Sequence, residues 1–149
     1  MPREHFDITM SPEELSSFLG SFQRLVLATN DRDGGTWGDA VAYHFDGSRI
    51  YFRVPEHTRS LANIRSDDRV CCAVESHPHG TSYYDIRAAL VHGRAEPLNG
   101  SEGPGVLTAL DGDPVDGSST GPVFSVGLDD VVSFVFAKIA YRYQDRSDL

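Results

Sequence analysis

Residues 25–64 read, in succession, LVLAT, NDRDGG, TWGDAVAYHF, DGS, RIYFRV, PEH and TRSLANI. Three of these pieces are rich in β-branched and aromatic residues, and short polar turns that contain glycine separate them. This pattern is typical of strands joined by hairpins, and Asp46-Gly47-Ser48 predicts a tight turn. The strands are expected over residues 25–29, 36–45 and 49–54. Pro55 ends the third strand, and a short helix is expected over residues 58–64.

The patterns on either side extend the same architecture. Ser11 and Glu14 have the spacing of a capping box before apolar residues at helical spacing, so we expect a helix over 12–22. Residues 99–122 contain six Gly and three Pro, which predicts a long loop. Further strands are expected over 69–75, 83–98 (interrupted by Gly93) and 131–143. Consecutive hairpins with few helices predict a mainly β protein, a six-stranded antiparallel β-barrel with short flanking helices.

Aromatic residues predict a partner for this barrel. More of them lie near its expected edges than one small core holds, which predicts a homodimer that covers an edge or a face of the sheet. The residues concerned are Tyr83, Tyr84, Phe134, Phe136, Tyr141 and Tyr143.

Size and charge limit the classes of function. The 149 residues (16.4 kDa) fit a single domain, 1–149, and the net charge of −9 argues against a nucleic-acid partner. No apolar run reaches the length of a membrane span or of a secretory h-region. We therefore expect a soluble, cytoplasmic protein whose partners are a small-molecule substrate and a second copy of itself.

The junction before the second helix is the strongest candidate for a binding site. Thr58, Arg59 and Ser60 stand where a loop enters a helix, and helix amides backed by a guanidinium bind phosphate well. Residues 49–69 contain five Arg and three acidic residues, a local charge of +2 in a chain of net charge −9. The alternative is that these arginines belong to a solvated surface.

Read together, several short motifs give the chain a resemblance to a known family. They are Leu27-Ala28-Thr29, Asp33-Gly34, Val41-Ala42-Tyr43, Asp46-Gly47, Arg49 to Arg53, Thr58-Arg59-Ser60, Asn63-Ile64-Arg65, Asp67 to Val70, Tyr83 to Arg87 and Val91 to Glu96. In this order and spacing they resemble the pyridoxamine 5′-phosphate oxidase-like family of flavin-binding split barrels, over somewhat more than half of the chain.

The resemblance implies a homodimer of split β-barrels that holds FMN, or the deazaflavin F420, at the dimer interface; some members bind haem. It places the cofactor phosphate at Thr58, Arg59 and Ser60. It places the ring along the strands that contain Val41, Tyr43, Arg53 and Val54. A flavin-dependent oxidoreductase that transfers hydride to or from a small substrate is the function implied. The alternative is a split barrel without redox activity, either a flavin or haem carrier or a cofactor-free binding module.

The chain departs from the family pattern at three places. Ser60 stands where the family usually has Lys, and the loss of that ammonium removes a phosphate contact of about 1.5–3 kcal/mol. Thr36 and Ala40 stand where prolines are frequent, and the loop 99–122 replaces a helical segment. Arg53 and Arg59 are the residues that could compensate for the missing ammonium.

Other residue patterns carry weaker signals. His77 and His79 lack partners at metal-site spacing, and the acidic residues at 111–116 lack the register of a calcium loop, so we predict no metal site. Trp37 could stack on a flavin ring or pack on the first hairpin, and His57 or His92 could reach a cofactor. The adjacent Cys71 and Cys72 point to opposite faces of a strand and cannot form an ordinary disulfide. No side chain is identified as an acid–base catalyst.

Overall fold

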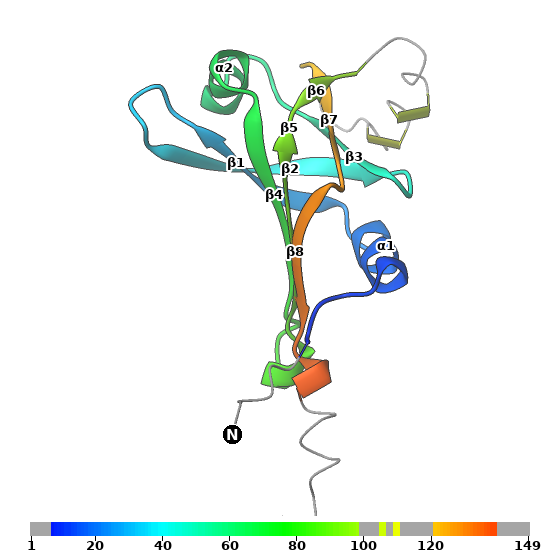
Figure 1. Cartoon of the computed structure of the whole chain (residues 1–149). Helices are drawn as coiled ribbons and strands as arrows, with labels where there is room; N and C mark the ends of the chain where they lie inside the picture. Colours follow the sequence, from blue (N-terminus) through cyan, green and yellow to red (C-terminus); the bar gives the residue numbers. More distant parts are fainter. Residues whose placement is uncertain (1–6, 99–104, 107–108, 111–120, 140–149) are drawn as a thin grey trace, which may run out of the picture.

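A computed structural model describes residues 7–98, 105–106, 109–110 and 121–139 of the chain (Figure 1). Its helices are α1 (Pro12–Gly20), α2 (Arg59–Ser66) and the 3-10 turn η1 (Tyr83–Asp85). The strands are β1 (Arg24–Asn30), β2 (Thr36–Phe45), β3 (Arg49–Arg53), β4 (Arg69–Ser76), β5 (Arg87–Arg94), β6 (Glu96–Pro97), β7 (Val123–Gly127) and β8 (Asp130–Val135). They form one antiparallel sheet in the order β6-β7-β3-β2-β1-β4-β5-β8.

The sheet curls until β5 approaches β7; four strands separate the two in the sheet order, but they are adjacent in space. Gly93 of β5 makes this approach possible, since a Cβ there would lie 2.7 Å from a methyl carbon of Val126. The expected interruption at Gly93 is therefore a close crossing of two strands. The result is a mainly β, curled half-barrel with short helices, as the sequence predicted.

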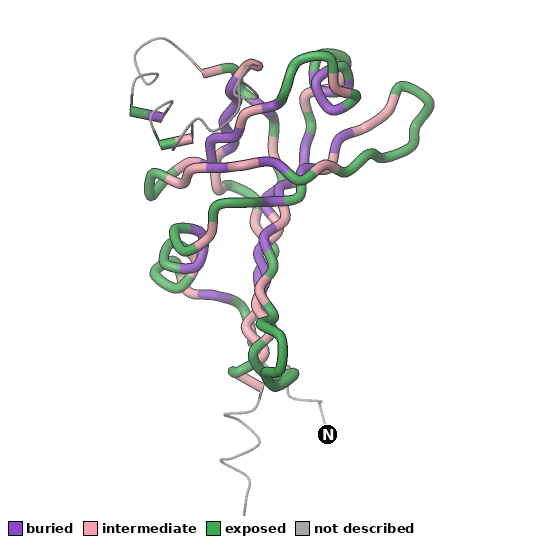
Figure 2. Tube along the Cα trace, turned by 180° about the vertical axis from the view of Figure 1, so that it is seen from behind, coloured by how far each residue is buried: buried purple, intermediate pink, exposed green. Residues whose placement is uncertain are grey.

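The core fills the inside of this curl. Residues alternate between buried and exposed along β1 and β4, so one face of each strand points into the core (Figure 2). The largest fully buried side chains include Phe52, Leu19, Leu27, Ile50 and Val91. Phe18 and Leu19 of α1, and Leu61 and Ile64 of α2, join the same cluster, so both helices pack on the inner side.

Two local predictions, the cap of the first helix and the turn at Asp46, are confirmed. Ser11 Oγ accepts from the Glu14 amide at 3.1 Å and Glu14 accepts from the Ser11 amide at 3.0 Å, which completes the capping box of α1. The turn between β2 and β3 is built on Asp46, whose carboxylate accepts the amide hydrogens of Ser48 and Arg49, both at 2.8 Å. Gly47 occupies the left-handed region there, with φ of 101°.

The predicted number of strands was wrong: the sheet has eight strands rather than six. The expected strand 83–98 is divided into η1, β5 and β6, because the Ser82 hydroxyl caps a turn and the chain bends at Ala95. Strand β7 was missed because four of its five residues are buried and show no alternation. It is defined by pairing with β3, in which Tyr51 lies opposite Ser125, a contact distant in sequence.

The end of the chain also differs from the prediction. Strand β8 ends at Val135, and the chain turns at Phe136 into a short helical segment at 137–139, so the strand expected over 131–143 is shorter. Most of the predicted loop 99–122 and residues 140–143 lie outside the described residues. Among the described helices, none is long and apolar enough to cross a membrane.

Candidate functional site

The start of α2 is shaped by the chain that precedes it. His57 has φ of 64°, an uncommon backbone conformation for a residue other than glycine, and it turns the chain into the helix. Thr58 is the N-cap: its hydroxyl accepts from the Leu61 amide at 3.3 Å and donates to the Pro55 carbonyl at 2.7 Å. The predicted loop-to-helix junction is therefore present, with the Thr58 hydroxyl already bonded on both sides.

Arg59 binds a carboxylate of this same chain. Its Nε donates to Asp31 Oδ1 at 2.9 Å and its Nη2 to Asp31 Oδ2 at 2.5 Å, a bidentate ion pair. The guanidinium also lies 4.3 Å from the centre of the Trp37 ring. These hydrogen bonds from Arg59, followed by one from Asn63, lower the pKa of Asp31 from its ordinary value. The positive charge predicted to meet a phosphate is thus already paired.

Ser60 is also bonded to a carboxylate of this chain, that of Asp39. Ser60 is 1% exposed, and its hydroxyl donates to Asp39 Oδ2 at 2.5 Å. The indole Nε1 of Trp37 donates to the same oxygen at 3.1 Å. Trp37 therefore packs and bonds within the hairpin and against Arg59. Asp31 and Asp39 could not be predicted from the sequence, because only the packing of α2 on the β1–β2 hairpin brings them to Arg59 and Ser60.

Three of the predicted ring-binding residues, Val41, Tyr43 and Val54, have side chains in the core. The Tyr43 hydroxyl donates to the Leu19 carbonyl at 2.6 Å, and burial raises the pKa of Tyr43 to about 12. Residues of this kind reach a ligand outside the barrel only through their backbone. In the middle of the same strand, the outward positions that alternate with the inward ones are occupied by the small residues Gly38, Ala40 and Ala42, flanked by Thr36 and His44.

The first part of β2 has a free edge beside α2. It pairs with β1 from Thr36 to Ala42, but with β3 only from Tyr43 to Phe45, so the outer edge of residues 36–42 has no strand neighbour among the described strands. Arg53, at the end of β3, donates to the Gly121 carbonyl at 2.6 Å. The Ser60–Asp39 hydrogen bond ties this edge to the start of α2. Unpaired backbone groups of an edge are donors and acceptors available to a polar ring.

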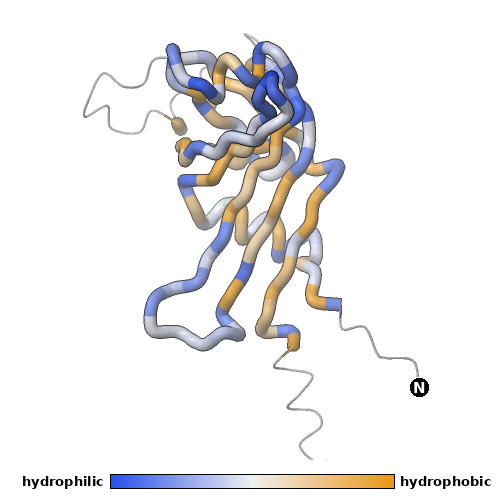
Figure 3. The backbone as a smooth tube through the Cα atoms, turned by 90° about the vertical axis from the view of Figure 1, so that its left-hand side faces the viewer, coloured by the Kyte–Doolittle hydropathy of each residue, from blue (hydrophilic) through white to orange (hydrophobic). Residues whose placement is uncertain are grey.

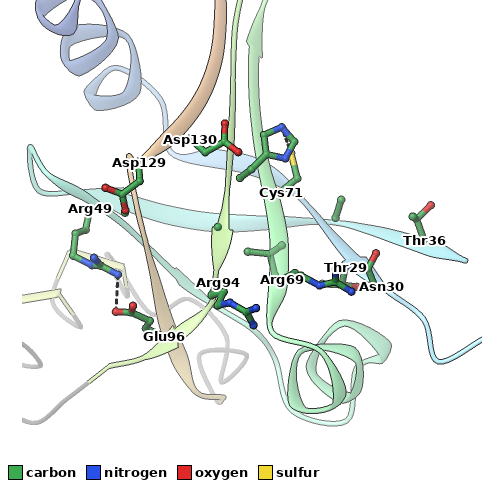
Figure 4. Close-up of a pocket in the computed structure, with 15 residues that line it drawn as sticks. Thr29, Asn30, Thr36, Arg49, Arg69, Cys71, Arg94, Glu96, Asp129 and Asp130 are labelled. Carbon is green, nitrogen blue, oxygen red and sulfur yellow. Dashed lines mark hydrogen bonds and ion pairs between the residues drawn. The ribbon is translucent and has the colours of Figure 1, made fainter. Parts of the chain in front are cut away.

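A groove of about 710 Å³ lies where β1, β4 and β5 meet the β7–β8 turn (Figure 4). Three arginines line it, and each is paired with a carboxylate. The pairs are Arg49–Glu96 at 2.9 Å, Arg69–Asp67 at 2.7 Å and Arg94–Asp68 at 2.6 Å. The groove is therefore polar but its cations are balanced, and it offers less attraction to an anion than its arginine content suggests.

Within the groove, Cys71, His92 and Asp130 lie opposite one another on three neighbouring strands. Cys71 Sγ is 4.0 Å from His92 Nε2. Burial raises the pKa of the Cys71 thiol, which disfavours the nucleophilic thiolate form. The sequence indicated that His92 could reach a cofactor, but its position between Cys71 and Asp130 follows only from the register of the three strands.

A metal site is not found among the residues that the structure describes, where no group of three potential ligands is close enough together. His77 Nε2 lies 3.2 Å from the Ser82 carbonyl, in a loop between β4 and η1. The acidic stretch 111–116 lies outside the described part of the chain.

The region formed by β2 and the start of α2 fits the ring of a flavin but not its phosphate. A planar ring could lie against the small outward residues Gly38, Ala40 and Ala42 and bond to the free edge of β2. A phosphate monoester does not fit the predicted position as it stands, because Arg59 and Ser60 are bonded to Asp31 and Asp39. A phosphate bound by Arg59 and Ser60 would lie near two carboxylates, those of Asp31 and Asp39, and only one guanidinium.

Solved structures of proteins with the same fold are numerous. A conserved hypothetical protein from Mycobacterium tuberculosis aligns over 93% of this chain and 92% of its own, with a TM-score of 0.72 and 22% identity. An FAD-binding protein from Mesorhizobium loti covers 84% and 93%, with a TM-score of 0.68 and 19% identity. A haem-binding protein from Mycobacterium smegmatis covers 91% and 62%, with a TM-score of 0.65 and 17% identity. At these identities the similarity shows the fold alone.

A search of curated proteins finds no match. A sequence model of the pyridoxamine 5′-phosphate oxidase family, however, matches residues 11–105, which include α1, α2 and strands β1 to β6. The match covers well over half of the 149 residues and confirms the resemblance that the short motifs indicated. The chain belongs to the pyridoxamine 5′-phosphate oxidase family of split-barrel proteins.

Proposed function

We propose that this protein is a flavin-dependent oxidoreductase that binds the ring of its cofactor beside the free edge of β2. The observation that carries the proposal is the combination of that edge with the small side chains of Gly38, Ala40 and Ala42. Small residues leave room for a planar ring beside this edge, and the edge supplies backbone donors and acceptors to its polar atoms. FMN, or F420, is the cofactor that the sequence favours. The bound ring would carry the hydride chemistry, while the protein orients it.

We further propose that a second copy of the chain completes the site. Ala40, Val26, Ala73, Leu90 and Val132 lie opposite one another across β2, β1, β4, β5 and β8 and form an apolar row on the outer face. Val26 and Val132 are 51% and 52% exposed. The strands of this row are largely hydrophobic in the view from the side opposite α1 (Figure 3). An exposed apolar face of this kind is typical of a protein interface.

The position of this outer-face row links the two proposals. Ala40 belongs both to the row and to the surface proposed for the ring, so a partner packed on the row would also cover the ring. Exclusion of water from one side of the ring is what a hydride-transfer site requires. The homodimer and the flavin site are therefore expected together.

The alternative function is a split barrel that carries a ligand without redox turnover. It is favoured by one observation, the bonding of Arg59 and Ser60 to Asp31 and Asp39, which weakens the predicted phosphate site. Relatives of the same fold are described as FAD-binding and as haem-binding. Haem is therefore included among the ligands to test.

The experiment is a visible absorption spectrum of the purified chain, followed by titration with FMN, F420 and haem. Saturable binding of a flavin or deazaflavin supports the proposal. The bound cofactor is then reduced chemically and mixed with a small acceptor. Reoxidation faster than that of free cofactor supports the oxidoreductase, and reoxidation slower than that of free cofactor supports the carrier. Saturable binding of haem alone would contradict the oxidoreductase.

A further inference from the structure

Two carboxylates occupy the position predicted for the cofactor phosphate. The carboxylate of Asp31, in the turn between β1 and β2, accepts hydrogen bonds from Nε and Nη2 of Arg59, at 2.9 and 2.5 Å. Asp39 receives the Ser60 hydroxyl at 2.5 Å. The two side chains that would donate to a phosphate therefore already donate to anions of the protein.

Both carboxylates are held in place from a second side. Asn63 Nδ2, in the next turn of α2, donates to Asp31 Oδ1 at 2.8 Å, and Trp37 Nε1 donates to Asp39 Oδ2 at 3.1 Å. Asn63 is itself buried and also donates to Thr29 Oγ1 at 3.1 Å. The Asp31 side chain is only 10% exposed. A phosphate that displaced either carboxylate would have to break several of these bonds at once.

The balance of charge points the same way. Arg59 contributes one positive charge, and Asp31 and Asp39 contribute two negative charges, so the predicted phosphate position has a net negative charge. A Lys at position 60, as the family resemblance implies, would bring that net charge to zero. Ser60 cannot, and its hydroxyl is already bonded to Asp39. A dianion is repelled here, whereas a hydroxyl group can donate to carboxylate oxygens.

We propose that Asp31 and Asp39 turn this end of the site from a phosphate-binding subsite into one that accepts a neutral, hydroxyl-bearing tail, so that riboflavin binds at least as tightly as FMN. The inference rests on the proposed flavin function, and it concerns only the end of the cofactor remote from the ring. The two carboxylates are specificity-determining residues.

The test compares riboflavin with FMN on the full-length chain, by quenching of the fluorescence of each flavin. The wild-type chain is expected to give a Kd for FMN no lower than that for riboflavin. The variants Asp31→Asn and Asp39→Asn each remove one negative charge with little change of shape. Each is expected to tighten FMN by about tenfold, the effect of one charge-assisted contact, and to weaken riboflavin, because the substituted side chain loses the charge that accepts from the hydroxyl-bearing tail; the ratio of the Kd for FMN to the Kd for riboflavin should therefore fall by about tenfold or more.

Asp46→Asn is the matched control, because it removes the same charge at the distant β2–β3 turn, where Asn is also a favoured turn residue. It is expected to leave both Kd values unchanged. Thermal unfolding of each variant shows that it is folded, and the wild-type comparison needs no variant at all.

The possible failures are distinct. Wild-type protein that binds FMN tenfold or more tightly than riboflavin would overturn the inference and leave the proposed function standing. Equal tightening of FMN by the control and by Asp31→Asn would also overturn it, since the effect would then be one of overall charge. Wild-type protein that binds neither flavin would overturn the proposed function and the inference with it.

Discussion

Closure of the barrel depends on the absence of a side chain at position 93. A Cβ on Gly93 would lie 2.7 Å from Cγ1 of Val126, far closer than two carbon atoms approach without repulsion. Val126 is fully buried and β-branched, so neither its position nor its rotamer can change freely. We therefore expect Gly93→Ala to force β5 and β7 apart.

The size of the effect follows from this contact. Overpacking by one methyl in a tight core costs about 1–3 kcal/mol, and we expect a loss in this range. For a chain of this length each 1 kcal/mol lowers Tm by about 2–4 °C, so the expected decrease is about 2–12 °C. The assay is thermal unfolding of Gly93→Ala and wild type at one protein concentration, because dimerisation would make Tm depend on concentration.

The double variant separates this explanation from a general intolerance of Ala in β5. Val126→Ala removes the two methyl groups and alone costs about 2 kcal/mol through lost burial and a cavity. In the Val126→Ala background the methyl group at position 93 has room, so adding Gly93→Ala should lower the free energy of unfolding no further. Independent, additive losses from the two substitutions would refute the proposed closure, as would a Gly93→Ala chain with unchanged Tm.

Three further predictions concern the elements around the site. Thr58→Ala should lower the free energy of unfolding by about 1 kcal/mol through loss of the α2 cap, whereas Thr58→Ser should keep the cap. The measurement is chemical denaturation, and equal midpoints for Thr58→Ala and Thr58→Ser would contradict the role of Thr58 as a cap. Tyr43, whose pKa burial raises to about 12, should remain protonated when exposed tyrosines ionise near pH 10; the stability from its burial should be complete below pH 10 and disappear between pH 10 and 12. Absorbance titration at 295 nm of wild type and Tyr43→Phe should differ only in this late step, and loss of an early step would contradict it. Hydrogen bonds from Arg69 are the main cause of the lowered pKa of Asp67, so the ionised Asp67 should stabilise the fold at neutral pH and lose this effect as pH falls below about 4. The Tm of Asp67→Asn should therefore fall less on acidification than that of wild type. The same dependence of Tm on pH in both proteins would contradict a stabilising role of the Asp67 carboxylate.

The sequence predicted those parts of the fold that depend on neighbouring residues. The capping box at Ser11 and Glu14, the Asp46 turn and the break at Gly93 are local patterns with a local physical cause. Strand β7 was missed because its residues are buried and its only regular partners, β3 and β6, are remote or short. Strand β8 was predicted too long because an apolar run does not show where the chain leaves the sheet.

The candidate site was predicted only in part for a similar reason. The position of Thr58 as a cap could be read from the loop-to-helix pattern, and Arg59 and Ser60 follow it directly. Their partners Asp31 and Asp39 lie more than 20 residues away, in a hairpin whose polar residues resemble any other turn. A count of charges in residues 49–69 could not include them, and it therefore overstated the positive charge available to a ligand.

The most direct test of the account is a flavin titration of the wild-type chain and of Val132→Glu, with the molar mass of each measured by light scattering. Val132 lies at the end of the outer-face row, 52% exposed, and a carboxylate there would prevent a second copy from packing. Val132→Thr, which keeps the shape without a charge, is the matched control. We predict that wild type and Val132→Thr are dimers that bind flavin, and that Val132→Glu is a folded monomer that does not. A folded monomer that binds flavin as tightly as wild type would contradict the proposal that the ring lies between two copies of this chain.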